Sequence, residues 1–117
     1  MKTILLDTNF IIYCYKNKIR IQEEISRNLD ESFEISILDK CMEELKKVSE
    51  EVYKFTNKLN FKIIPSEYPE KYADFNLLHM ADKDIIIATN DKQLKENLKK
   101  RSFPVFVVRQ KNHINLI

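Results

Sequence analysis

Glycine is absent from all 117 residues, and tryptophan is absent as well. The phosphate-binding loops of Walker-type and dinucleotide-binding proteins need glycine, because the backbone must approach the phosphate closely. Both classes of nucleotide site are therefore excluded. The chain also has only two cysteines, Cys14 and Cys41, which lie far apart and form no CxxC pair. We expect two buried, reduced thiols rather than a disulfide or a zinc site.

Long apolar runs are missing too. No hydrophobic stretch approaches the roughly 18 residues that a membrane span needs, and Asp7 interrupts the first apolar segment too early for a signal peptide. Hydrophobic residues make up 44% of the chain and charged residues 32%, proportions that are typical of a soluble globular protein. We expect one compact domain over residues 1–117, located in the cytoplasm and not in a membrane.

The charge of the chain is unevenly placed. Residues 1–91 carry 13 basic and 17 acidic side chains, whereas residues 92–117 carry seven basic and one acidic. One interpretation is an exposed helix face that keeps the protein soluble. The other is that a polyanion such as RNA binds there. The basic side chains predicted on the outer face of this segment, and so the candidate RNA contacts, are Lys92, Lys95, Lys99 and Arg101.

Two short apolar runs end in the same kind of polar sequence. The run IIIA at residues 85–88 is followed by Thr-Asn-Asp, and the run ILL at residues 4–6 is followed by Asp-Thr-Asn. Such short runs favour strands that are covered on both faces, as in a parallel sheet. Ligands bind at the carboxyl edge of such sheets, so Asp7 and Asp91 are predicted to lie at a functional edge.

The alternation of strands and helices predicts a three-layer α/β fold with a mostly parallel central sheet of about five strands. The helices are expected over residues 9–18, 20–29, 40–59, 70–81 and 91–101. The strands are expected over residues 3–7, 33–38 and 104–108, and a further strand begins at residue 85 and ends just before Asp91. Residues 61–64 form either a short strand or an extended crossing, and residues 114–117 are expected to form a final edge strand.

The helix expected over residues 40–59 has the most regular apolar stripe, with 4-3-4-3-4 spacing. Its members are Cys41, Leu45, Val48, Val52, Phe55 and Leu59. At about 100° per residue, Glu43 falls opposite the stripe and Glu44 falls on its flank. An inward carboxylate lowers stability unless a cation or a donor receives it. Glu44 is therefore either a site residue or a boundary glutamate whose carboxylate reaches water.

Four carboxylates fall where a strand ends or a helix begins, namely those of Asp7, Glu44, Asp74 and Asp91. If they are brought together they repel one another, and a hard divalent cation such as Mg²⁺ or Mn²⁺ is the usual remedy. Such an ion can activate a bound water for attack on phosphorus. The sequence therefore predicts metal-dependent phosphodiester hydrolysis, and the two histidines are expected at the surface instead.

Four motifs in order also resemble a known family. They are the apolar run closed by Asp7-Thr8-Asn9, the glutamates before Leu45, the Ala73-Asp74 pair at a helix start, and the Ala-Thr-Asn-Asp run closed by Asp91. Together they resemble the PIN-domain ribonucleases over nearly the whole chain. The closing segment is similar to the archaeal branch related to small-subunit rRNA-processing PIN endonucleases, and toxin-type PIN nucleases share the catalytic pattern. Ser102 stands where these relatives commonly have glycine.

The resemblance implies an endoribonuclease that uses one or two Mg²⁺ or Mn²⁺ ions. It implies that Asp7, Glu44, Asp74 and Asp91 hold the metal directly or through water, while Asn9 and Thr89 orient the carboxylates or the attacking water. RNA is the implied substrate. The implied protein partner is an antitoxin or a ribosome-assembly factor, and homodimers are common in the family.

Other phosphate-handling folds match the chain less well. A receiver-like phosphoacceptor domain needs an acidic pair after its first strand and an aspartate after its third, and a haloacid-dehalogenase-type phosphatase needs a second aspartate after Asp7-Thr8. The main alternative is a non-catalytic PIN-fold module that binds RNA or acts as a scaffold in ribosome assembly. Four carboxylates argue against it, because an inactive site has no reason to keep groups that repel one another.

Overall fold

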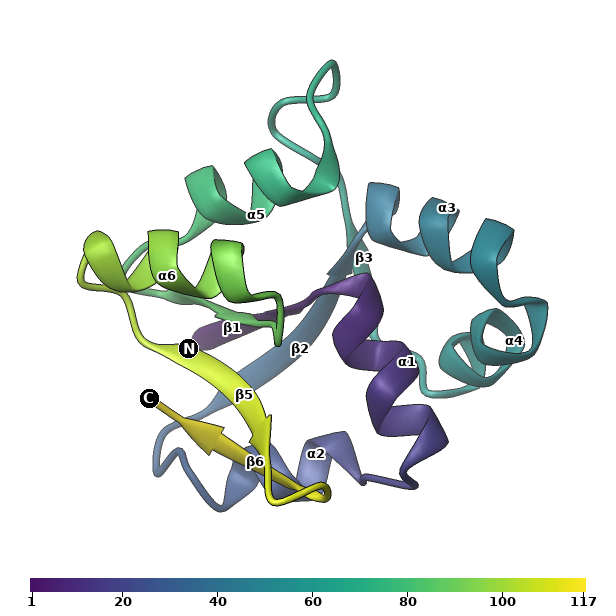
Figure 1. The fold of residues 1–117 in the computed structure, drawn as a ribbon, viewed down its shortest axis with the longest axis horizontal. Coiled ribbons are helices and arrows are strands. Elements are labelled where there is room, and N and C mark those ends of the chain that lie inside the picture. The colour runs from purple at the N-terminus through teal and green to yellow at the C-terminus, as the bar shows by residue number, and fades with distance from the viewer.

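The fold is built on one six-stranded sheet (Figure 1). The computed structural model describes residues 1–117. The strands are β1 (Lys2–Leu6), β2 (Phe33–Leu38), β3 (Lys62–Ile64), β4 (Ile85–Ala88), β5 (Val105–Arg109) and β6 (His113–Leu116). They lie in the order β3-β2-β1-β4-β5-β6, and all neighbours are parallel except β5 and β6. The mostly parallel α/β fold is confirmed, and the sheet has six strands rather than about five because the segment left open at residues 61–64 contains the short strand β3.

Six helices complete the fold. They are α1 (Thr8–Lys16), α2 (Ile21–Ser26), α3 (Asp39–Val48), α4 (Glu50–Lys58), α5 (Ala73–Met80) and α6 (Lys92–Lys100). Helices α1, α3 and α4 contact one another, whereas α5 packs against α6. Figure 1 shows the two groups on different sides of the central strands, as right-handed crossovers to opposite edges require. None of the helices combines the length and the apolar character that crossing a membrane would require.

The central strands are buried on both faces. Successive side chains of a strand point to opposite faces of the sheet. Ile4, Leu5 and Leu6 of β1 are nevertheless all fully buried, as are Ile87 and Ala88 of β4. This is the burial expected of a parallel sheet with helices on each side. The apolar runs therefore form strands for the predicted reason.

The two cysteines are free and buried, as the sequence predicted. Burial raises the pKa of Cys14 and of Cys41 to about 12. Both therefore remain thiols at neutral pH and contribute to the apolar core.

The single helix predicted over residues 40–59 is wrong, because the chain breaks at Ser49. Ser49 is extended, with φ −153° and ψ 103°, and its side chain accepts a hydrogen bond from the Val52 nitrogen at the start of α4. The break redirects the second half of the apolar stripe. Val48, Phe55 and Leu59 are 68%, 41% and 38% exposed, whereas they were predicted to face the core.

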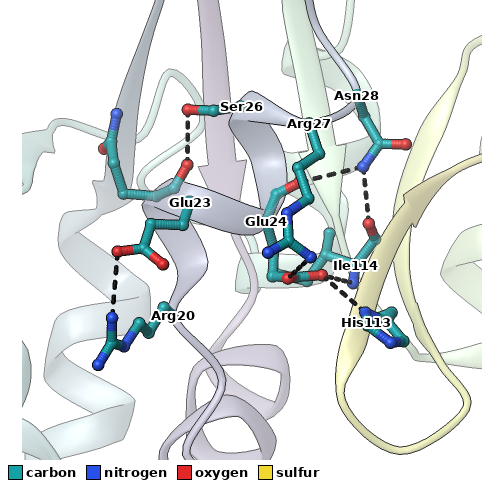
Figure 2. A network of polar contacts seen from close by, with 9 residues as sticks. Arg20, Glu23, Glu24, Ser26, Arg27, Asn28, His113 and Ile114 are labelled. Atoms are coloured by element: carbon teal, nitrogen blue, oxygen red, sulfur yellow. Dashed lines mark hydrogen bonds and ion pairs between the residues drawn. The ribbon is translucent and has the colours of Figure 1, made fainter.

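A buried glutamate fastens the last strand to α2 (Figure 2). Glu24 is only 8% exposed, and its carboxylate accepts a hydrogen bond from the Ile114 nitrogen at 3.1 Å. Arg27 and His113 lie 2.9 Å and 3.3 Å from the same carboxylate, and the Asn28 side chain donates to the Ile114 carbonyl at 2.8 Å. These contacts hold β6 on the sheet edge, although the sequence of this strand is short and only partly apolar.

The lack of glycine leaves left-handed backbone positions to other residues. Positive φ angles occur at Lys18 (55°), Asn60 (56°), Ser102 (65°), Gln110 (53°) and Lys111 (69°). A side chain with a Cβ adopts this region at a cost of about 1 kcal/mol, and asparagine tolerates it best. The chain therefore carries modest backbone strain in its turns, including the turn at Ser102.

Candidate active site

Asp7 lies at the centre of the carboxyl edge of the sheet. It follows β1 directly, caps α1, and is 5% exposed. One carboxylate oxygen accepts from the Thr8 nitrogen and the other accepts from the Thr89 hydroxyl, each at 2.8 Å. No lysine, arginine or histidine forms a salt bridge with it. Asp7 is therefore fixed in orientation but has no compensating positive charge.

The environment of Asp7 favours its protonated form. The pKa of Asp7 is raised from 3.8 to about 6, chiefly by burial and in part by the charges of Asp74 and Glu44, while the hydrogen bonds from Thr89 and Thr8 oppose the rise. The pKa of Asp74 is raised as well, first by burial and then by the charge of Asp91. These repulsions mean that the four predicted carboxylates lie around one place.

Thr89 links the two aspartates that end β1 and β4. It is fully buried; its hydroxyl donates to Asp7 and accepts from the Asp91 nitrogen at 3.1 Å. Asp91 in turn caps α6, where its carboxylate accepts from the Leu94 nitrogen at 2.8 Å. One hydroxyl group therefore holds the Asp7 carboxylate and the backbone of Asp91.

Glu44 reaches the same place from α3. Its side chain is exposed, as is that of Glu43, so burial does not separate the two glutamates. What does separate them is Thr8, whose hydroxyl donates to the Glu44 carboxylate at 3.2 Å. The sequence indicated Thr8 only as part of the Asp7-Thr8-Asn9 motif, and its contact with Glu44 was missed. The available signal was the occurrence of threonine within two residues of aspartate at both strand ends.

Asp74 stands in the first turn of α5, is exposed, and lies between two hollows. One hollow, of about 450 Å³, is lined by Glu44 and Asp74 and by three lysines, which are Lys40, Lys47 and Lys71. The other hollow, of about 210 Å³, includes Asp74 and Asp91 among its lining residues. The sequence did not predict these lysines as neighbours of the acidic residues, because α3 and the loop before α5 meet only in the folded chain.

The remaining predicted residues lie outside this network. Asn9 is exposed in the first turn of α1. On α6, Lys92 and Lys99 are exposed, Lys95 is half-buried, and Arg101 is exposed at the helix end. The structure thus brings Asp7, Thr89 and the other three carboxylates together, and places the basic side chains on the helix that Asp91 caps.

The donor atoms suit a hydrated ion better than a closed cage. No three histidine, cysteine, aspartate or glutamate side chains are arranged to hold one metal ion among them. Carboxylate oxygens with no basic partner nevertheless match the preference of Mg²⁺, which commonly takes one or two protein carboxylates and keeps several waters. Asp7 and its neighbours therefore fit such an ion by their chemistry, with water completing the contacts.

The largest hollow of the molecule lies elsewhere. It has a volume of about 720 Å³, lies between α1, α2 and α4, and contains none of the predicted site residues. Its lining is mostly apolar and includes the exposed Phe55 and Leu59. The acidic residues are thus found beside two smaller hollows and not in this one.

Comparisons with known proteins agree with the motifs. A family model described as a PIN like domain matches residues 4–111. The chain is 40% identical to ribonuclease VapC4 of Methanocaldococcus jannaschii, over 99% of this chain and 97% of that protein. It is 31% identical to the rRNA-processing protein fcf1 of Schizosaccharomyces pombe over 83% of this chain. The match covers 53% of that relative, so this chain spans about half of its length.

A solved structure supports the same assignment. The PIN domain endonuclease Utp24 superposes with a TM-score of 0.81 at 29% identity, covering 97% of this chain and 90% of the other. The matches extend over nearly the whole chain and include proteins named as ribonuclease and endonuclease. The sheet edge, the carboxylates around it and these matches agree, and the chain belongs to the PIN domain family.

Proposed function

We propose that the protein is a metal-dependent endoribonuclease that hydrolyses RNA phosphodiester bonds at the edge formed by β1 and β4. One observation carries the proposal. Asp7 is 5% exposed, has no basic partner, and is surrounded closely enough by other carboxylates that their charges raise its pKa. Such an arrangement destabilises the protein on its own, so its presence is best explained by a bound cation and a reaction. The ribonuclease and endonuclease relatives add independent support.

The proposed ligands are Asp7, Glu44, Asp74 and Asp91, directly or through water. When Mg²⁺ or Mn²⁺ is bound there, it neutralises the carboxylates, polarises a phosphate oxygen and lowers the pKa of a coordinated water. The chain itself supplies position. Thr89 holds Asp7 and Thr8 holds Glu44 by the hydrogen bonds described above, and we propose that the exposed Asn9 orients the attacking water.

The basic face of α6 is the proposed contact for the RNA backbone. Its members are Lys92, Lys95, Lys99 and Arg101, which follow directly on Asp91. Phosphates that lie along this helix would lead the strand to the carboxylates at its N-terminus. Because these contacts carry no sequence information, they position the RNA without selecting it.

Cleavage of RNA by the purified protein tests the proposal. Single-stranded and structured RNA should be cut in the presence of Mn²⁺ or Mg²⁺, and EDTA or the substitution Asp7→Asn should abolish cutting. Glu44→Gln should also lower the rate, whereas the matched control Glu43→Gln, on the same exposed helix face but without the Thr8 contact, should retain it. Cleavage that persists in Asp7→Asn would remove that residue from the mechanism.

The non-catalytic alternative makes the opposite prediction, which is RNA binding without metal and without cleavage of any RNA offered. The full-length similarity to a ribonuclease favours the enzyme. Two cellular roles follow from the family, since an enzyme of this kind acts either in rRNA processing or as the toxin of a toxin–antitoxin pair. The neighbouring gene separates them, because a small antitoxin-like reading frame beside this one supports the toxin and a ribosome-assembly partner supports processing.

A further inference from the structure

A small hollow between α5 and α6 adjoins the proposed cleavage site. Its volume is about 210 Å³. It is lined by Asp74, Phe75 and Leu78 from α5 and by Asp91, Gln93, Leu94 and Asn97 from the start of α6. Two of these residues are proposed metal ligands, and the other five have no part in the reaction described above. Figure 1 shows α5 and α6 lying side by side.

The apolar wall of this hollow is held rigidly. The Phe75 ring stacks on the His79 ring with centroids 4.0 Å apart and planes at 30°, and the Tyr68 ring meets its edge at 5.4 Å. The Lys71 ammonium group lies 5.3 Å from the centre of the same ring. Phe75 is therefore neither free nor simply exposed, and His79, which the sequence placed on the surface, supports it. A wall that is already ordered loses little entropy when a ligand binds.

The opposite wall presents two neutral amides. The Gln93 side-chain nitrogen donates to the Asn97 side-chain oxygen at 3.3 Å. This one bond leaves the Gln93 oxygen, one of its N–H groups and both N–H groups of Asn97 without a partner in the chain. Both side chains are accessible, so these groups can bind a ligand. Asparagine and glutamine amides match the donor and acceptor pattern along the edge of a nucleobase.

We propose that this hollow is a subsite for one unpaired nucleobase of the RNA beside the scissile phosphate, and that Gln93 and Asn97 determine which base is accepted. This inference rests on the proposed function. The volume excludes a duplex, and the lining of apolar side chains with two amides suits a flat, neutral, hydrogen-bonding group. A phosphate is a poor occupant, because no lysine or arginine lines the hollow.

Mapping of cleavage sites tests the subsite. Wild-type protein should cut a mixed pool of single-stranded RNA with a base preference at one position next to the scissile bond. In the double variant Gln93→Ala/Asn97→Leu this preference should fall roughly five- to tenfold, while the rate at disfavoured sites stays the same. The matched control is Gln22→Ala/Asn57→Leu, which removes exposed amides of α2 and α4 and should leave the preference unchanged.

Binding without cleavage separates this inference from the proposed function. Fluorescence anisotropy in EDTA compares oligoribonucleotides that differ at one base, with wild-type protein and with the double variant. A base preference that the variant loses supports the subsite even if no RNA is ever cut. Cleavage without any base preference, or a preference that is equal in wild type and variant, overturns the subsite and leaves the nuclease standing.

Discussion

Asp7→Asn should stabilise the metal-free protein while it removes activity. The rise of the Asp7 pKa from 3.8 to about 6 corresponds to about 3 kcal/mol at roughly 1.4 kcal/mol per pKa unit. The amide keeps an oxygen for the Thr8 nitrogen, but its NH₂ group cannot accept from the Thr89 hydroxyl, which costs about 1 kcal/mol. The net expectation is a variant about 2 kcal/mol more stable than wild type at neutral pH.

The direction of the pH dependence follows from the same shift. The folded protein binds the Asp7 proton more tightly than the unfolded chain does, so the contribution of Asp7 to wild-type stability is most favourable below pH 3.8. It falls as the pH rises from 3.8 to about 6 and is then level. The advantage of Asp7→Asn should therefore be absent at the acid end and complete at pH 7 and above.

Urea unfolding in EDTA measures this difference, with far-ultraviolet circular dichroism as the signal because the chain has no tryptophan. Asp91→Asn is the matched control, since asparagine caps a helix about as well as aspartate and the stability should change by less than about 0.5 kcal/mol. Excess Mn²⁺ should stabilise wild type and leave Asp7→Asn unaffected. A variant that is less stable than wild type at neutral pH, or a difference that does not vary with pH, would refute the reasoning.

Two further outcomes concern α6 and the turn that follows it. Replacing Lys95, Lys99 and Arg101 by glutamine should weaken RNA binding and make it less dependent on salt, as a salt titration would measure. The control variant Lys54→Gln on α4 should bind RNA about as well as wild type. Unchanged RNA binding in the triple variant would mean that the basic face of α6 serves solubility alone. Ser102→Gly should raise the free energy of unfolding by about 0.5 to 1 kcal/mol, because glycine adopts the φ of 65° without a Cβ clash. A loss of stability in this variant would show that the turn is unstrained.

Local patterns predicted the elements wherever the pattern itself decides the structure. Strand β2 runs over residues 33–38 as predicted, and the apolar runs before Asp7 and Asp91 form buried neighbouring strands. The long helix failed because its 4-3 spacing continues through Ser49 while the backbone does not. A signal was present, since serine followed by two glutamates is typical of a helix start.

The sequence indicated which residues form the candidate site more readily than how they are arranged. Spacing alone placed Glu44 inward, but the side chain is exposed and only the Thr8 hydroxyl directs it to the site. The position of Asp74 beside both Asp7 and Asp91 depends on the strand order, which the alternation of helices and strands does not specify. These are contacts between distant segments, and no local periodicity encodes them.

The apolar strands are as necessary to the proposed chemistry as the carboxylates. Leu6 of β1 pairs with Ala88 of β4, and the Asp7 nitrogen donates to the Ala88 carbonyl, so the next residues, Asp7 and Thr89, come into hydrogen-bonding range. A slip of one residue between these strands would turn every side chain of one strand to the other face and separate the pair. The backbone ladder of β1 and β4, which pairs Thr3 with Ile85 and Leu6 with Ala88, holds this register. The polar residues therefore specify the reaction, and the apolar runs before them fix the distances on which it depends.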